Sequence, residues 1–393
     1  MSAILAQLNS AAAQHDPYPL YAQLHARGPI SFAPDGALVA VGYSQCGALL
    51  REHRLRKAPG RLLAAAGYPD WMEHPALRMM FASMLMLNPP EHTRLRRAVS
   101  VAFTPTRVAA LVPAITRITQ DRLDELDGRS DFIEAFAFPL PVAVIGELLG
   151  IPAGDRAMFQ DLSRDWTAVL DTLDHDAVAR ADRAATAIET YLGDLATTRA
   201  AHPADDLISA LVTTGEPLAR TDLLTTVALL LAAGFETTTS LLANSLLALL
   251  AHPRQAHLLR TEPRLATAAV EELLRYDTPV QVLYGRTVVD ELSIDALIVP
   301  AGTRVLTMVG AANRDPSVYA DPDDLDLRRD GPPPLSFGGG IHYCLGAPLA
   351  RLEAQLALPL LLQRYPHLSL AGEPVRRDGL TLRGYAQLPV VTN

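Results

Sequence analysis

The stretch that decides the fold runs Phe337-Gly338-Gly339-Gly340-Ile341-His342-Tyr343-Cys344-Leu345-Gly346. It places one cysteine after a glycine-rich loop and before an apolar run, Leu345 to Leu362, that predicts a helix. A thiol at a helix N-terminus faces unpaired N–H groups and the positive end of the helix dipole, which favour the thiolate. The glycines let the backbone approach a bulky partner closely. This pattern suits a metal-centred macrocycle held by a thiolate, and the alternative is a buried structural cysteine.

The same ten residues, read as F-G-x-G-x-H-x-C-x-G, resemble the haem-ligand loop of the cytochromes P450. The resemblance implies haem b, which is iron protoporphyrin IX, with Cys344 as the axial ligand of its iron. It extends from about Asp16 to the C-terminus, and its motifs occur in the family's order. It therefore implies one cytochrome P450-like domain over residues 1–393.

Bulk composition indicates a globular chain. The 393 residues are 49% hydrophobic and 20% charged, which supplies ample material for a core and gives no sign of disorder. The length alone is compatible with two or three domains or with one large domain. The formal net charge of −9 gives no reason to expect nucleic-acid binding.

Cysteine content and apolar runs bear on cofactors and location. The two cysteines, Cys46 and Cys344, cannot form a disulfide framework or ligate an iron–sulfur cluster, and Cys46 is expected to be ordinary packing. Residues 1–15 lack a basic region followed by an apolar run, so we expect no signal peptide. No uncharged apolar run reaches membrane-span length. We expect a soluble, cytoplasmic monomer without membrane or nucleic-acid partners.

The order in which helix-like and strand-like sequence patterns occur along the chain predicts the fold class. A hairpin is expected around Pro34-Asp35-Gly36, and helical patterns dominate from about residue 88 to about residue 251. Strand-like text is concentrated between about residues 280 and 309 and again from 380 to 391. We therefore predict a mainly α fold with a small β-rich part (α+β), in one continuous unit with a long central helix.

The central helix is predicted from Thr221 to about Ala251, a rod of roughly 45 Å. Its text is apolar nearly all round, which indicates burial, yet it contains the string Ala233-Gly234-Phe235-Glu236-Thr237-Thr238-Thr239-Ser240. A carboxylate and four hydroxyls in a buried helix are costly unless they have partners. Two interpretations are open: a solvated stripe on one side of the helix, or a hydrogen-bonded relay that moves protons.

The string A-G-x-E-T-T resembles the oxygen-activation segment of the P450 family. The resemblance implies that Glu236 is the acid of a proton relay and that Thr237 donates to bound dioxygen. Phe235 departs from the family, which often has histidine there, and this departure bears on pocket shape or water access. Pro334 also replaces a frequent histidine, and no role is carried over to it.

A basic helix is predicted after Asn88-Pro89-Pro90, and on it His92 and Arg96 share one face at i,i+4 spacing. Such cations suit two carboxylates or phosphates, or else form a solvated basic face. The run 89–97 resembles the family's helix that holds the haem propionates, together with Arg286 and His342.

Other arginines are assigned to structure and to docking. Glu272 and Arg275 form an i,i+3 pair that resembles the family's buried E-x-x-R pair, with Arg329 as the expected third member. This group would be structural. A second set, Arg94, Arg97 and Arg351, is expected to form a basic patch on the cysteine side that guides an acidic electron donor.

Five of the eight methionines fall between residues 57 and 87, in irregular apolar text. Methionine adapts to irregular shapes and recurs at binding surfaces, although a loop packed on the core would use it equally well. In the resembling family this region covers the substrate pocket, so we predict pocket lining. The five residues are Met72, Met79, Met80, Met84 and Met86.

Together, these resemblances imply a haem-thiolate monooxygenase that uses dioxygen. Electrons must come from outside, because no flavin domain or iron–sulfur cluster fits in the chain, and a ferredoxin with its ferredoxin reductase is the expected source. The expected reaction is hydroxylation or epoxidation of an apolar or amphipathic small molecule in secondary-metabolite biosynthesis, such as a polyketide or macrolide.

Four alternatives stay open at this point. Within haem chemistry they are peroxide-driven oxidation, against which the Glu236–Thr237 pair argues, and oxidative C–C or C–O coupling. A haem carrier or gas sensor has little use for an acid–alcohol pair inside its central helix. A zinc protein that uses His342 and Cys344 lacks two further ligands at credible spacing.

Overall fold

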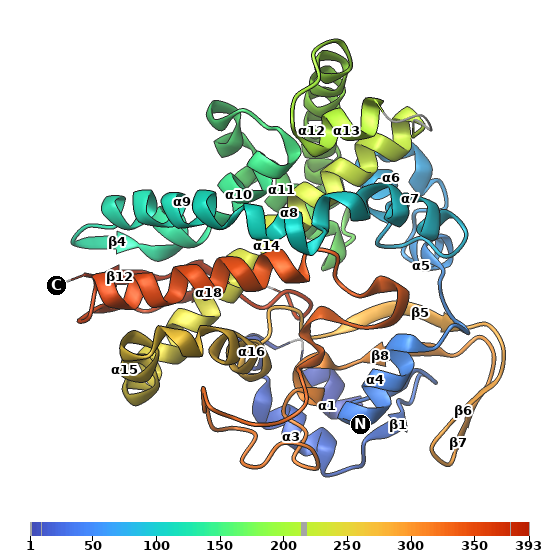
Figure 1. Cartoon of the computed structure of the whole chain (residues 1–393). Coiled ribbons are helices and arrows are strands. Elements are labelled where there is room, and N and C mark those ends of the chain that lie inside the picture. Colours follow the sequence, from blue (N-terminus) through green and yellow to red (C-terminus); the bar gives the residue numbers. More distant parts are fainter. Residues whose placement is uncertain (1, 9, 214–217, 378, 393) are drawn as a thin grey trace. The chain divides into compact units, whose positions relative to one another are not determined.

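The computed structural model describes residues 2–8, 10–213, 218–377 and 379–392. It is mainly helical with small β-sheets and a long central helix (Figure 1), which confirms the fold class expected from the sequence. Backbone contacts divide the chain into two compact units. Unit 1 comprises Met1–Arg56, Ile115–Phe138 and Thr237–Asn393, and unit 2 comprises Lys57–Ala114 and Pro139–Glu236. The expected single domain stays a prediction.

The largest sheet has five strands in the order β1-β2-β8-β5-β3. The hairpin predicted near residue 35 is confirmed as β1 and β2, in which Ile30 lies opposite Ala40. β2 runs parallel to β8, so segments far apart in the sequence share this sheet. The strands are β1 (Ile30–Phe32), β2 (Leu38–Ala40), β3 (Leu55–Lys57), β5 (Leu283–Val288) and β8 (Arg304–Thr307).

The smaller sheets all belong to unit 1. The predicted strand text at 380–391 forms β11 (Tyr385–Gln387) and β12 (Pro389–Val391). β11 pairs with β10, and β12 lies between β4 and β9. The remaining strands are β4 (Arg129–Asp131), β6 (Leu292–Ile294), β7 (Leu297–Val299), β9 (Ser369–Leu370) and β10 (Val375–Arg376).

Helix α4 (Tyr43–Arg51) packs beside the five-stranded sheet (Figure 1) through Leu49 and Leu50, which join one hydrophobic cluster with Leu38 and Val305. Cys46 is fully buried, and its thiol donates a hydrogen bond to the carbonyl of Ala40. This confirms the prediction that Cys46 is an ordinary packed residue of the core. The other helices of unit 1 are α1 (Ser2–Gln7), α2 (Ala11–His15), α3 (Tyr18–His25), α9 (Val112–Glu125, from Ile115), α15 (Pro253–Thr261), α16 (Ala266–Tyr276), α17 (Val309–Ala312) and α18 (Ala347–Arg364).

Unit 2 is helical and is organised around α12, which packs on α6 and α11. Trp166 of α11 is completely buried, and its indole N–H donates to the carbonyl of Ala76 on α6 at 3.2 Å. The helices of unit 2 are α5 (Pro59–Ala65), α6 (Pro75–Phe81), α7 (Glu91–Ser100), α8 (Pro105–Ala110), α10 (Pro139–Leu149), α11 (Phe159–Thr167), α12 (His175–Ala201) and α13 (Leu207–Thr213).

The long central helix is α14 (Arg220–Ala251), which agrees closely with the predicted bounds and contributes residues to both units. It is long and apolar enough to cross a membrane by length and composition, but 83% of its most apolar window is buried inside the protein. This burial is the property expected of a core helix.

Candidate active site

The cysteine loop is closed by a backbone hydrogen bond from the N–H of Cys344 to the carbonyl of Phe337, at 2.9 Å. Cys344 itself is exposed, and it lies two residues before Gly346, the N-cap of α18. The thiol is therefore presented just outside the N-terminus of an eighteen-residue helix, where the helix dipole favours a thiolate.

Glycines in this loop are required by its geometry. Gly338 and Gly340 have φ values of +70° and +64°, in the left-handed region that side-chain-bearing residues avoid. A Cβ on Gly340 would also lie 2.7 Å from the carbonyl oxygen of Leu50, at the end of α4. The loop thus lies directly on backbone, which cannot move aside as a flexible side chain could.

Arg286 reaches the same end of α4. Its guanidinium donates to the carbonyls of Leu49 and Leu50, each at 3.3 Å, so Arg286 and the cysteine loop meet at Leu50. Burial lowers the pKa of Arg286, and within the described part of the chain no carboxylate is paired with it. A half-buried cation without an acidic partner among the described residues fits a bound group that carries carboxylates, as haem does through its propionates.

An aromatic and ionic cluster braces the loop from α18. The guanidinium of Arg351 lies over the ring of Phe337, 4.3 Å from its centroid, and donates to the hydroxyl of Tyr343 at 3.1 Å. Both carboxylate oxygens of Glu271 on α16 accept from the same guanidinium. The sequence did not reveal this cluster, because Glu271 and Arg351 are 80 residues apart.

These ion pairs reduce the positive charge that the sequence suggested for a docking patch. Arg351 is paired with Glu271, and Arg94 of unit 2 is paired with Asp222 at 2.5 Å. Arg97 is exposed on α7. Two of the three cations assigned to the patch therefore carry a compensating carboxylate.

Helix α7 holds the two cations predicted to bind propionates. His92 is 2% exposed and Arg96 is half-buried, one turn further along the same face. Burial, and then the positive charge of Arg96, lowers the pKa of His92. The alternative of a solvated basic face does not fit a histidine that is almost completely buried.

The polar string in α14 is also buried. Glu236 is 7% exposed, and the side chains of Thr238, Thr239 and Ser240 are buried as well. This burial argues against the solvated stripe. The accessible residues at this level are Ala233, Gly234 and Thr237, whose spacing of one and four residues puts them on one face of the helix.

Gly234 is explained by close packing within unit 2. A Cβ at this position would lie 2.8 Å from Cγ1 of Ile145 on α10. The glycine therefore lets α10 and the first part of α14 approach closely, and the buried acid follows two residues later.

The predicted group of Glu272, Arg275 and Arg329 is confirmed in unit 1. Arg275 binds both oxygens of Glu272, at 2.7 and 2.9 Å, and Nε of Arg329 donates to Glu272 at 3.1 Å. Arg275 is 2% exposed and also donates to the carbonyls of Asn313, Pro322 and Asp324. The group ties α16 to the loop that precedes the cysteine motif.

Each unit thus holds part of the predicted set. Unit 1 contains Cys344, His342, Arg286 and Thr237, and the first three belong to the loop and to the strand that meets it at Leu50. Unit 2 contains the remaining three residues of the set, His92, Arg96 and Glu236.

Sequence reasoning missed another buried acid, Glu353 of α18. It is 1% exposed, and its Oε2 atom has no hydrogen-bond partner among the described residues. Burial raises the pKa of Glu353 well above its usual value. An acid nine residues after the motif cysteine, within apolar helical text, was the available signal.

Comparison with known proteins agrees with this geometry. The family model described as Cytochrome P450 matches residues 156–382. The chain is 40% identical to the cytochrome P450 monooxygenase PikC of Streptomyces venezuelae, covering 95% of this chain and 91% of that protein. It is 38% identical to 6-deoxyerythronolide B hydroxylase of Saccharopolyspora erythraea, with 95% and 96% covered.

A solved structure, the bacillaene polyketide synthase cytochrome P450 PksS of Bacillus subtilis, superimposes with a TM-score of 0.87 at 33% identity. It covers 98% of this chain and 99% of its own. The chain belongs to the cytochrome P450 family, as its sequence led us to expect, and it is a cytochrome P450 monooxygenase. The family implies a haem-thiolate cofactor, a small-molecule substrate and redox partners.

Proposed function

We propose that this monooxygenase hydroxylates or epoxidises an apolar or amphipathic small molecule of the polyketide or macrolide class, in secondary-metabolite biosynthesis. The observation that carries the haem-thiolate assignment is the exposed thiol of Cys344 outside the N-terminus of α18, on a loop that only glycine can form. Relatives named as 6-deoxyerythronolide B hydroxylase and as a polyketide biosynthesis cytochrome P450 support the substrate class.

The cofactor that fits these residues is haem b. Cys344 would ligate the iron, and His92, Arg96, Arg286 and His342 would bind the propionates. When bound, haem supplies the redox-active iron at which dioxygen is activated. The half-buried guanidinium of Arg286, which has no carboxylate partner among the described residues, and the side chains of His92 and Arg96 on one face of α7 favour a group with two carboxylates.

The acid and the alcohol of α14 would handle protons. Glu236 is almost fully buried, whereas Thr237 lies on the accessible face with Ala233 and Gly234. The Thr237 hydroxyl can therefore donate a hydrogen bond to a molecule beside the helix, and the carboxyl of Glu236, the preceding residue, would be the acid of the relay, shielded from bulk water.

Electrons would come from a ferredoxin and its reductase, and the cytoplasm is the compartment we propose. Arg97 is an exposed cation on α7, while Arg94 and Arg351 are paired with acids. We therefore propose Arg97 as the member of the predicted patch that most attracts an acidic donor.

The absorption spectrum of the reduced protein with carbon monoxide tests the assignment of Cys344. We expect the red-shifted Soret band of a thiolate-ligated haem. A band at the position that histidine-ligated haem gives would show that Cys344 is not the ligand.

A screen of macrolides and other polyketides for shifts of the haem spin state, followed by product identification, tests the substrate class. Products of coupling without oxygen insertion would contradict the proposed reaction.

A further inference from the structure

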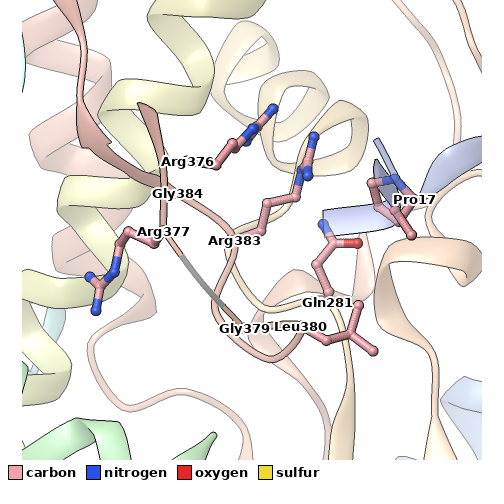
Figure 2. A pocket seen from close by; sticks show the side chains of 9 residues that line it. Pro17, Gln281, Arg376, Arg377, Gly379, Leu380, Arg383 and Gly384 are labelled. Carbon is pink, nitrogen blue, oxygen red and sulfur yellow. The ribbon is translucent and has the colours of Figure 1, made fainter. Parts of the chain in front are cut away.

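A small polar cavity lies in unit 1 between the N-terminal segment, here residues 13–17, and the C-terminal hairpin, which is formed by β10 and β11. Its empty volume is about 250 Å³, including a part that is open to solvent. Pro17, just before α3, and Gln281, just before β5, form one wall. The other wall is formed by Arg376, the last residue of β10, and by Arg377 and Arg383, which lie between β10 and β11 (Figure 2). None of these residues belongs to the haem site proposed above.

Two guanidiniums at this cavity share one carboxylate. Arg383 donates from Nε to Asp277 at 2.6 Å and from Nη2 to the carbonyl of His15 at 3.0 Å. Tyr18 donates to the same oxygen of Asp277 at 2.7 Å. Arg376 comes only within 3.9 Å of the other oxygen of Asp277. Asp277 is thus engaged by Arg383 and Tyr18, and Arg376 is left with a distant partner.

Arg376 has donors that no described residue accepts from. Its side chain is 14% exposed, and its Nε and Nη1 atoms are shielded from solvent without a hydrogen-bond partner among the described residues. One face of the guanidinium is covered by the ring of Tyr385, 4.0 Å away. Burial, and then the charge of Arg383, lowers the pKa of Arg376. Because arginine does not give up its proton in proteins, only an acceptor or an anion can compensate.

The opposite wall does not supply that acceptor. The amide nitrogen of Gln281 donates to the carbonyl of Thr278 at 2.7 Å, and its oxygen accepts from Tyr21 at 2.9 Å. Figure 2 shows the side chains of Arg376 and Arg383 pointing in the same direction, whereas that of Arg377 points the other way. The cavity therefore combines a saturated polar wall with a cationic one.

We propose that this cavity binds a small oxyanion, the carboxylate or phosphate group of a free ion or small metabolite, through Arg376 with support from Arg383. Planar guanidinium groups match the oxygens of both groups, and the cavity is smaller than the pockets that hold drug-sized ligands. The bound anion would join the N-terminal segment to the C-terminal hairpin and so stabilise unit 1.

Thermal unfolding of the haem-loaded protein tests this proposal. Wild-type protein is compared in sodium chloride, sodium acetate and sodium phosphate at equal pH and ionic strength. We expect acetate, phosphate or both to raise Tm over chloride by about 2 °C or more, increasing with concentration. The acetate arm reports a carboxylate site and the phosphate arm a phosphate site. Equal Tm values in all three salts would overturn the proposal.

Variants locate the response. Arg376→Met should abolish the anion-dependent rise, and Arg376→Lys, which lacks the forked donors, should reduce it at least by half. Arg254→Met removes the same charge at an exposed position of α15, outside the lining of the cavity, and should keep the full rise. If Arg376→Met does not fold, the comparison of wild type, Arg376→Lys and Arg254→Met decides. An undiminished response in Arg376→Lys, or its loss in Arg254→Met, would contradict the assignment to Arg376.

Discussion

Thr237 differs from the hydroxyl-bearing residues that follow it in α14, because it is accessible while Thr238, Thr239 and Ser240 are buried. If the Thr237 hydroxyl donates a hydrogen bond to bound oxygen species, Thr237→Ala should divert reducing equivalents to peroxide. The ratio of peroxide to product should then rise by about tenfold or more, while haem content is unchanged. The ratio of peroxide to product measures this. Thr239→Ala, two residues further along the helix, should leave the ratio unchanged, and equal ratios in wild type and Thr237→Ala would contradict the role.

A second prediction at the residue scale concerns Glu353 and the pH dependence of stability. Its pKa is raised in the folded protein, so the folded state holds a proton that the unfolded state releases above about pH 4.5. Stability should therefore fall as pH rises above that value, by up to about 1.4 kcal/mol per pH unit. Glu353→Gln should remove this part of the decline, and chemical denaturation across pH measures it. Glu373→Gln, an exposed control, should follow the wild type. A parallel pH dependence in Glu353→Gln would contradict the prediction.

At the scale of elements, α7 brings a prediction about cofactor retention. If His92 and Arg96 bind propionates, the double variant His92→Ala with Arg96→Ala loses two charge-assisted hydrogen bonds, each worth about 1.5–3 kcal/mol. Haem transfer to an acceptor protein should then be at least 10-fold faster. Arg97→Ala, on the same helix but exposed, should retain haem normally. Unchanged transfer in the double variant would mean that these cations do not hold the cofactor.

Elements with local sequence patterns were predictable, and those built from distant partners were not. Three features are visible in short stretches of contiguous sequence: the apolar residues of α14, the Glu272–Arg275 spacing and the cysteine loop. By contrast, Arg129–Asp131 carries no strand pattern, and it becomes β4 only because β12 pairs with it. The cluster of Arg351 and Glu271 was hidden for the same reason.

For the candidate site, local motifs were enough to name the residues, whose roles stay predictions, but their exposure was not predictable from the sequence. Whether Glu236 would be buried or solvated depended on packing by other elements, such as α10 against Gly234. The charge state of the basic patch depended on Asp222 and Glu271, which lie far from their partners in the sequence.

At the largest scale, Asp277 links the two ends of the chain within unit 1, through Tyr18 and Arg383. Burial alone would raise the pKa of Asp277, but Arg383 and then Arg376 hold it below its usual value. A lowered pKa gives stability that is present at neutral pH and is lost as pH falls below about 3.8.

Asp277→Asn should therefore destabilise the protein by about 3–5 kcal/mol at pH 7, because Arg383 loses its buried partner. Its stability should also fall less steeply in acid than that of the wild type. Denaturant titrations at pH 7 and in acid measure both effects. Asp290→Asn, an exposed acid in the same unit, should change neither, and a near-neutral Asp277→Asn would show that the link is unimportant.

The parallel pairing of β2 with β8 has a consequence for synthesis on the ribosome. β2 ends at residue 40, whereas β8 begins at residue 304. At a translation rate of about 5–20 residues per second, the sheet therefore stays incomplete for roughly 13–50 seconds. During that interval β2 has β1 available but lacks its other neighbour, β8, while unit 2 has all its residues once Glu236 has been added. In nascent chains of this protein, one edge of β2 thus lacks its partner until Thr307 has been added, and chaperones that bind at the ribosome have that interval in which to cover it.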